Sequence, residues 1–92
     1  MIYYESSIFN KILKNKLPKN VIKHFNNAFI ALDRTKDLKL FEIKQLSGDF
    51  KRSYFRLRKG KYRAIFFIEN NDFYIIEIGK REEVYDIWEL HR

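Results

Sequence analysis

The stretch YFRLRKGKYRAIFFI, residues 54–68, decides the fold of this chain. Apolar and cationic side chains alternate along it, which is typical of β-strands, because successive strand side chains point to opposite faces of a sheet. Lys59 and Gly60 lie between the two alternating runs and suit a two-residue turn, since glycine tolerates a positive φ. We therefore predict a β-hairpin with strands at 54–58 and 62–68.

The two faces of this hairpin differ in chemistry. One face is apolar throughout and is expected to pack on helices; it carries Phe55, Leu57, Tyr62, Ala64, Phe66 and Ile68. The other face carries Tyr54, Arg56, Arg58, Lys61, Arg63, Ile65 and Phe67. With the turn at 59 and 60, Arg56 lies opposite Arg63. Like charges opposite each other destabilise a sheet by up to about 1 kcal/mol per pair. When a polyanion binds, the same paired cations become stabilising.

The sequence before the hairpin predicts one strand, two helices and a second strand. A short strand is expected at 2–4, followed by a serine-capped helix at about 6–16. Pro18 suits the first turn of a second helix, because its missing N–H costs nothing there. One apolar stripe runs down that helix at helical spacing, through Val21, Ile22, Phe25, Phe29 and Leu32. The period then changes to two, which predicts a strand at 38–46.

The sequence after the hairpin predicts a second tight turn, a last strand and a terminal helix. The asparagine pair at 70–71 tolerates left-handed backbone and so indicates the turn. A strand at 73–78, ended by Gly79, and a helix at about 81–90 follow. The order β-α-α-β-β-β-β with a short C-terminal helix indicates an α+β fold, in which two N-terminal helices pack on a twisted antiparallel sheet.

Composition restricts the class of protein. The 92 residues, 46% of them hydrophobic, fit a single ordered domain at 1–92. The chain has no cysteine, which excludes disulfides and thiolate zinc sites, and its two histidines are far apart. Neither a signal peptide nor an apolar run of the ~20 residues needed to span a membrane is visible, so we expect a cytoplasmic protein.

The positive charge is concentrated in one segment. The net charge is +7, and seven cations without a single acid lie within 51–63. They are Lys51, Arg52, Arg56, Arg58, Lys59, Lys61 and Arg63. The rest of the chain carries equal numbers of basic and acidic side chains. Such concentration predicts a polyanionic partner; the alternative is a solvated edge hairpin whose lysines block strand pairing.

The residues support metal-free phosphoryl chemistry better than any other kind. No Gly-rich phosphate loop, Ser-His-Asp set or clear carboxylate pair is visible. Arg81 and Tyr85 are four residues apart, so a helix presents both on one face, and we expect them to converge with Arg56 and Arg63. Guanidinium groups stabilise a pentavalent phosphate, and the 2′-hydroxyl of RNA is a built-in nucleophile. A tyrosine between cations can serve as acid or base.

At this point the sequence resembles the RelE/ParE superfamily of toxins, over nearly its whole length. The motif residues lie in the family's order: 9–14 with Leu17 and Pro18 resemble the two-helix opening, and 46–48 the "leucine-x-glycine" element. Residues 54–58 with 62–66 resemble the core "YxhRhGxYRhhF" signature, and 78–85 resemble the closing "hGHRxxVY" signature. The resemblance implies a RelE-like fold.

The RelE branch implies a ribosome-dependent, metal-independent mRNA endonuclease neutralised by a co-expressed antitoxin. By motif, Arg63 and Arg81 match the family's phosphate-stabilising arginines, and Tyr85 matches its C-terminal catalytic tyrosine. Arg56 and Tyr54 fall where RelE has lysines. Because arginine holds its proton, Arg56 is expected to stabilise charge rather than act as a base. Tyr85, or else Tyr54, is the proposed proton-transfer group.

The resulting site prediction has two parts. The catalytic residues are Arg56, Arg63, Arg81 and Tyr85. The RNA-binding residues are Lys51, Arg52, Tyr54, Arg58, Lys59, Lys61 and Lys80, the last at a position that is often histidine in the family. No metal or cofactor is expected.

The expected partners are a cognate antitoxin and mRNA on the ribosome, with no membrane contact. The free toxin is expected to be a monomer that joins a toxin–antitoxin hetero-oligomer. An antitoxin segment is expected to cover an exposed apolar patch formed by Ile65, Phe67, Tyr74 and Ile76. Two alternatives remain: a ParE-like inhibitor of DNA gyrase, and a nucleic-acid-binding member without catalysis.

Overall fold

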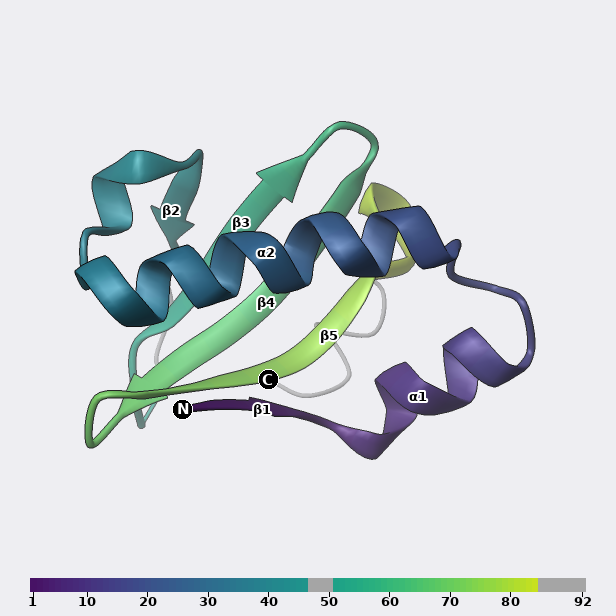
Figure 1. Ribbon diagram of the computed structural model, residues 1–92. Helices are drawn as coiled ribbons and strands as arrows, with labels where there is room; N and C mark the ends of the chain where they lie inside the picture. The colour runs from purple at the N-terminus through teal and green to yellow at the C-terminus, as the bar shows by residue number, and fades with distance from the viewer. Residues whose placement is uncertain (47–50, 85–92) are drawn as a thin grey trace.

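The computed structural model describes residues 1–46 and 51–84, which form one body of helices packed on a sheet (Figure 1). The elements are β1 (Ile2–Tyr4), α1 (Ser6–Leu13), α2 (Lys19–Thr35), the 3-10 helix η1 (Leu38–Leu40), β2 (Ile43–Gln45), β3 (Tyr54–Lys59), β4 (Tyr62–Glu69) and β5 (Asp72–Lys80). Residues 81–84 form a helical turn after β5. The rest of the predicted terminal helix lies outside the described residues.

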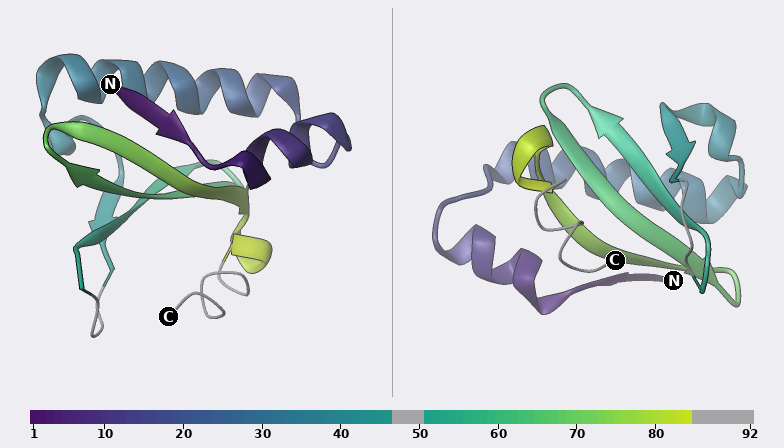
Figure 2. Two further views of the ribbon diagram at one scale, coloured as in Figure 1. Left: turned by 90° about the horizontal axis from the view of Figure 1, so that it is seen from below. Right: turned by 180° about the vertical axis from the view of Figure 1, so that it is seen from behind.

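The sheet has five strands in the order β1-β5-β4-β3-β2, with both helices against one face (Figure 2, left). This confirms the predicted α+β class and order of elements. The sheet is mixed, however, and not antiparallel throughout, because β1 runs parallel to β5. Parallel neighbours cannot be joined by a hairpin and need a long connection. The chain between β1 and β5 supplies it, because it includes both helices and strands β2, β3 and β4. A three-residue strand gives no sequence signal for its direction of pairing.

Helix α2 provides most of the helical side of the core. Pro18 is the N-cap, one position before the first turn in which it was predicted. Lys36 ends the helix in the left-handed region at φ 58°, donating its N–H to Leu32 O at 2.8 Å. Its buried side chains recur at helical spacing: Phe25, Ala28, Phe29 and Leu32. The Phe29 ring meets the Phe66 ring of β4 edge-on, with centroids 5.2 Å apart. The apolar face of the hairpin therefore packs on this helix, as expected.

The strand predicted at 38–46 is largely wrong. Only Ile43–Gln45 pairs as β2, and Leu38–Leu40 form a 3-10 turn. The cause is local, since the Asp37 carboxylate accepts a hydrogen bond from the Lys39 N–H at 3.0 Å. A short acidic side chain bonded to nearby backbone competes with strand pairing.

The turn of the central hairpin lies one residue further along than predicted. Lys59 pairs with Tyr62, so Gly60 and Lys61 form the turn, and Gly60 carries a positive φ of 58° at its first position. Glycine at that position fits a type II′ hairpin turn. Arg58 consequently lies opposite Arg63, and the predicted pairing of Arg56 with Arg63 is wrong. Each partner shifts by two residues, so the two faces keep their predicted membership except for Lys61, which lies in the turn.

Strand β5 continues through Gly79, which was predicted to end it. A register shift between Ile65 and Phe66 places Arg63 opposite Gly79. A Cβ at position 79 would lie 3.0 Å from Lys11 Nζ and 3.2 Å from Val84 Cγ2. Glycine here allows close packing between α1, β5 and the helical turn 81–84, and it does not break the strand.

Candidate functional site

The cationic hollow, lined by Lys61, Arg63, Lys80, Arg81 and Glu82, has a volume of about 280 Å³. It lies where the β3–β4 turn approaches the helical turn 81–84 (Figure 1). The register explains the meeting, because Tyr62 pairs with Lys80 and Arg63 with Gly79. The Arg81 N–H also donates to Lys61 O at 3.3 Å, which ties the two segments together. Arg63 and Arg81, predicted to converge, thus line the same hollow.

Arg63 is held rigidly by the hairpin that carries it. Only 6% of the residue is exposed. Its Nη1 donates to Gly60 O at 2.8 Å and to Tyr62 O at 2.9 Å. The guanidinium is therefore oriented by backbone of the turn before any ligand arrives. Because arginine keeps its proton at every physiological pH, this also places a permanent positive charge in the hollow.

The other two arginines of the hairpin lie along the same face of the sheet. Arg58 is exposed and pairs with Arg63 across the strands, so like charges are adjacent next to the hollow. Arg58 Nε lies 3.5 Å from Glu42 Oε2, an exposed ion pair that contributes little stability. Arg56 is half-buried and lies opposite Ile65, two pairs further from the turn. It does not line the hollow, although it was predicted to converge with Arg63 and Arg81.

Several predicted site residues lie away from the hollow. Lys59 falls on the helix-facing side of the sheet, where its Nζ lies 5.1 Å from the centre of the Phe41 ring. Lys51 is exposed and precedes Arg52, whose Nη1 lies 3.2 Å from Glu69 Oε2 at the other end of β4. Tyr54 packs at the same end, as described below. Tyr85 lies outside the described residues.

The predicted exposed apolar patch is partly covered. Ile65 is fully buried, together with Val84, against Leu46, Tyr54 and Ile76. The helical turn 81–84 lies over this face of the sheet, as the expected convergence of Arg81 with Arg63 requires, but the burial of Ile65 by Val84 was not predicted. An exposed patch centred on Ile65 is therefore wrong, although Phe67, Tyr74 and Ile76 keep partial exposure.

The aromatic stack, formed by Tyr3, Tyr74 and Phe67, was not predicted as a unit. The Tyr3 and Tyr74 rings are 5.0 Å apart with planes 16° from parallel, and Tyr74 and Phe67 are 4.9 Å apart at 9°. The Arg52 guanidinium carbon lies 4.1 Å from the centre of the Phe67 ring, and Tyr54 meets that ring edge-on at 5.8 Å. The members are direct neighbours across the strands. Only the parallel pairing of β1 brings Tyr3 into the stack, and the sequence does not signal it.

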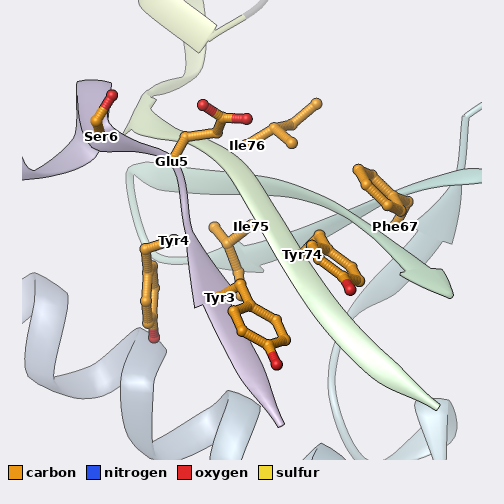
Figure 3. A pocket seen from close by; sticks show the side chains of 8 residues that line it. All are labelled: Tyr3, Tyr4, Glu5, Ser6, Phe67, Tyr74, Ile75 and Ile76. Atoms are coloured by element: carbon orange, nitrogen blue, oxygen red, sulfur yellow. The ribbon is translucent and has the colours of Figure 1, made fainter. Parts of the chain in front are cut away.

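A second hollow of about 180 Å³ adjoins this stack. Figure 3 shows Tyr3, Tyr74 and Phe67 side by side, with Ile76, Glu5 and Ser6 along one side of them. Partial burial raises the pKa of the Tyr74 phenol, and the nearby Asp72 carboxylate adds to the shift. The phenol is consequently neutral at physiological pH.

A buried ion pair supports the strand that leads into the cationic hollow. Lys11 of α1 pairs with Glu77 of β5, and its Nζ also donates to Ile78 O at 2.9 Å. Strand β1 pairs with β5 only as far as Ile75. The Lys11 ammonium therefore binds the edge of β5 beyond that point, next to Lys80 and Arg81.

Within residues 1–46 and 51–84, no group of three or more His, Cys, Asp or Glu side chains lies close enough to hold a metal ion. Across the same residues, no helix is long and apolar enough to cross a membrane. The charged groups that line the cationic hollow are two lysines, two arginines and one carboxylate, that of Glu82. Such a set can bind a phosphate and stabilise negative charge that develops on it.

The structure is similar to solved structures of RelE toxins. It matches the RelB–RelE antitoxin–toxin complex of Methanococcus jannaschii with a TM-score of 0.72 and 17% identity, covering 92% of this chain and 96% of that chain. The match to the RelE–RelB complex of Pyrococcus horikoshii has a TM-score of 0.68 and 19% identity, and it covers 87% of this chain and 92% of that chain. The match to a copper-bound mutant toxin of Helicobacter pylori has a TM-score of 0.65 and 17% identity, and it covers 90% of this chain and 96% of that chain.

No model of a protein family and no curated protein matches the sequence. At the identities found, the structural likeness concerns the fold. The chain has the fold of the RelE toxins, which confirms the fold that the sequence motifs predicted.

Proposed function

We propose that this chain is the toxin of a toxin–antitoxin pair and cleaves mRNA on the ribosome without a metal ion. The observation that carries the proposal is the cationic hollow, in which Arg63 and Arg81 meet although they belong to different elements. The similarity to toxins from RelB–RelE complexes supports the toxin class and an antitoxin partner. The proposed compartment is the cytoplasm, where mRNA is translated.

In the proposed reaction, the 2′-hydroxyl of the RNA attacks the adjacent phosphate. Its proton passes to a base, the bond to the 5′-oxygen breaks, and that oxygen takes a proton from an acid, leaving a 2′,3′-cyclic phosphate and a 5′-hydroxyl. The pentavalent state carries an additional negative charge. Arg63, already oriented by the turn, and Arg81 would stabilise this charge, and one such donor contributes about 3–4 kcal/mol.

Proton transfer needs a different group, because guanidinium does not release its proton. Tyr85 is the proposed acid or base, on the strength of its motif position alone. Glu82 is a carboxylate that lines the cationic hollow, and it is the alternative group to test. Arg56 and Arg58, on the same face of the sheet, would contact flanking phosphates and set the salt dependence of binding.

The direct test is cleavage of ribosome-bound mRNA in a translation extract, mapped by primer extension. Arg81→Ala is expected to reduce the rate by about 100- to 1000-fold, because Arg81 donates to the developing charge. The matched control is Arg34→Ala, on an exposed position of α2 away from the hollow, and it should cut like the wild type. Tyr85→Phe and Glu82→Gln separate the two candidate proton-transfer groups.

If Arg81→Ala cleaves mRNA as fast as the wild type, the cationic hollow is not the site of the reaction. Intact transcripts together with DNA damage in cells expressing the protein would instead indicate a ParE-like gyrase inhibitor. RNA binding without any turnover would indicate a member without catalysis.

A further inference from the structure

The face of the sheet that carries the cationic hollow has a second feature at its other end. Arg63 and Phe67 are four residues apart on β4, which is about 13 Å along a strand. The aromatic stack and its 180 Å³ hollow therefore lie within reach of a single RNA strand whose scissile phosphate occupies the cationic hollow. Both helices lie on the opposite face (Figure 2).

We propose that the hollow beside Tyr3, Tyr74 and Phe67 binds one unpaired base of single-stranded RNA. The proposal rests on the proposed function only in taking RNA as the ligand. A volume of about 180 Å³ is below the ~300–1000 Å³ of a drug-sized site and suits a single planar group. Tyr74 already stacks between Tyr3 and Phe67, so a base would continue the stack at Tyr3, the end ring, which is 41% exposed. Base–aromatic stacking adds affinity at single-strand sites.

The stack is polar at its margins, which fits a nucleobase better than an aliphatic side chain. Two of its three rings carry phenolic hydroxyls, and the Arg52 guanidinium stacks on the Phe67 ring. Guanidinium planes stack on bases and bind phosphates, so Arg52 suits both parts of a nucleotide. By contrast, the mostly apolar groove between α1 and α2, lined by Phe9 and Ile12 among others, lies away from the cationic segment.

Glu5 gives the hollow a preference among bases. Glu5 and Ser6 line it together with Ile76, and the Glu5 N–H donates to Ile75 O at 2.9 Å, which fixes the backbone at that point. An ionised carboxylate only accepts hydrogen bonds. Cytosine, adenine and guanine offer an exocyclic amino group to such an acceptor, whereas the only base donor of uracil, N3–H, is flanked by two carbonyl oxygens that repel a carboxylate. We therefore expect the hollow to prefer a base with an exocyclic amino group.

The experiment measures equilibrium binding of fluorescein-labelled, fully 2′-O-methylated RNA, which cannot be cleaved because the nucleophile is blocked. Tyr3→Leu should weaken binding by about 5- to 150-fold, the range for loss of one stacked base, and Tyr74→Leu should weaken it less, because Tyr74 lies inside the stack. The slope of affinity against salt should not change, because no ionic contact is lost. Phe9→Leu, an exposed aromatic on α1 that is outside this face, is the matched control and should bind like the wild type.

Two further variants keep the test valid if a tyrosine variant unfolds. Arg52→Lys, at an exposed position, keeps the charge and loses the planar stacking group, and should weaken binding. Oligocytidine should bind the wild type about 5-fold more tightly than oligouridine, and Glu5→Gln should reduce that ratio. Circular dichroism melting checks the fold of each variant.

Three results would overturn the proposal. The first is wild-type protein that does not bind the RNA. The second is a set of folded stack variants with unchanged affinity and no preference between cytosine and uracil. The third is loss of antitoxin binding in these variants with RNA affinity intact, which would make the face a protein-docking surface. This experiment does not measure cleavage, so the two proposals can fail separately. A protein that binds RNA in this way without cutting it would contradict the proposed function but not the base-binding site.

Discussion

Arg63 serves both the fold and the hollow, and this limits how it can be changed. Its Nη1 satisfies two carbonyls of the β3–β4 turn. Removing the side chain would lose both of these part-buried hydrogen bonds, each worth about 0.5–1.5 kcal/mol. Lysine keeps a charge and a donor but loses the planar fork that binds phosphate in two places. Arg63→Lys is therefore the informative substitution, whereas alanine would combine unfolding with loss of activity.

Tyr4 provides a pH-dependent test of packing at the residue scale. Its hydroxyl donates to Asn26 Oδ1 at 2.8 Å, and burial raises its pKa from 10.0 to about 12. The folded state therefore resists ionisation of this phenol more than the unfolded state does. Its contribution to the free energy of unfolding is present below pH 10 and is lost as pH rises through about 12.

Urea denaturation of wild type and Tyr4→Phe across this range measures the effect. The variant should be less stable at neutral pH by about 1 kcal/mol, for the lost hydrogen bond. The difference between the two proteins should shrink between pH 10 and 12, because only the wild type carries this phenol. A difference that stays constant with pH would show that Tyr4 is not buried as described.

At the scale of elements, Gly79 links α1, β5 and the helical turn that carries Arg81. Gly79→Ala would place a Cβ 3.0 Å from Lys11 Nζ, 3.2 Å from Val84 Cγ2 and 3.4 Å from Glu83 Oε2. Part of this environment must move, and overpacking costs about 1–3 kcal/mol. We expect a lower melting temperature and slower mRNA cleavage, because the turn bearing Arg81 shifts away from Arg63.

Gly60→Ala is the comparison for that prediction. No atom lies within 4 Å of the Cβ it would add, but the φ of 58° at Gly60 is strained for alanine. Both variants should be less stable than the wild type. At an equal loss of stability, Gly79→Ala should lose more cleavage activity than Gly60→Ala. Equal activity at equal stability would mean that the packing at position 79 does not position Arg81.

The elements also separate what the sequence predicts from what it does not. The hairpin with its two faces followed from alternation in 54–68, and α2 followed from its apolar stripe, because both patterns are local. The turn position at Gly60, the continuation of β5 past Gly79 and the burial of Ile65 were missed. Each depends on a contact with a distant segment, and alternation alone carries no information about register or long-range packing.

At the scale of the whole molecule, α1 and α2 lie on one face of the sheet, and both hollows lie on the opposite face, part of which the helical turn 81–84 covers. The cationic hollow lies at one end of that face and the aromatic stack at the other. The sequence predicted that Arg63 and Arg81 would converge, because strand alternation and the helical spacing of positions 81 and 85 place both on one face of the sheet. It did not predict the stack, because Tyr3 reaches Tyr74 only through the parallel pairing of β1.

The most direct test of a shared phosphate site is a double-mutant cycle on the rate of mRNA cleavage, with Arg63→Lys, Arg81→Ala and the double variant, all checked for folding. If both guanidinium groups act on one phosphate, each single variant is slow. The double variant should then be little slower than the slower single one, because groups that act as a unit are strongly non-additive. Free-energy effects that simply add, or a single variant that cleaves like the wild type, would contradict a common site.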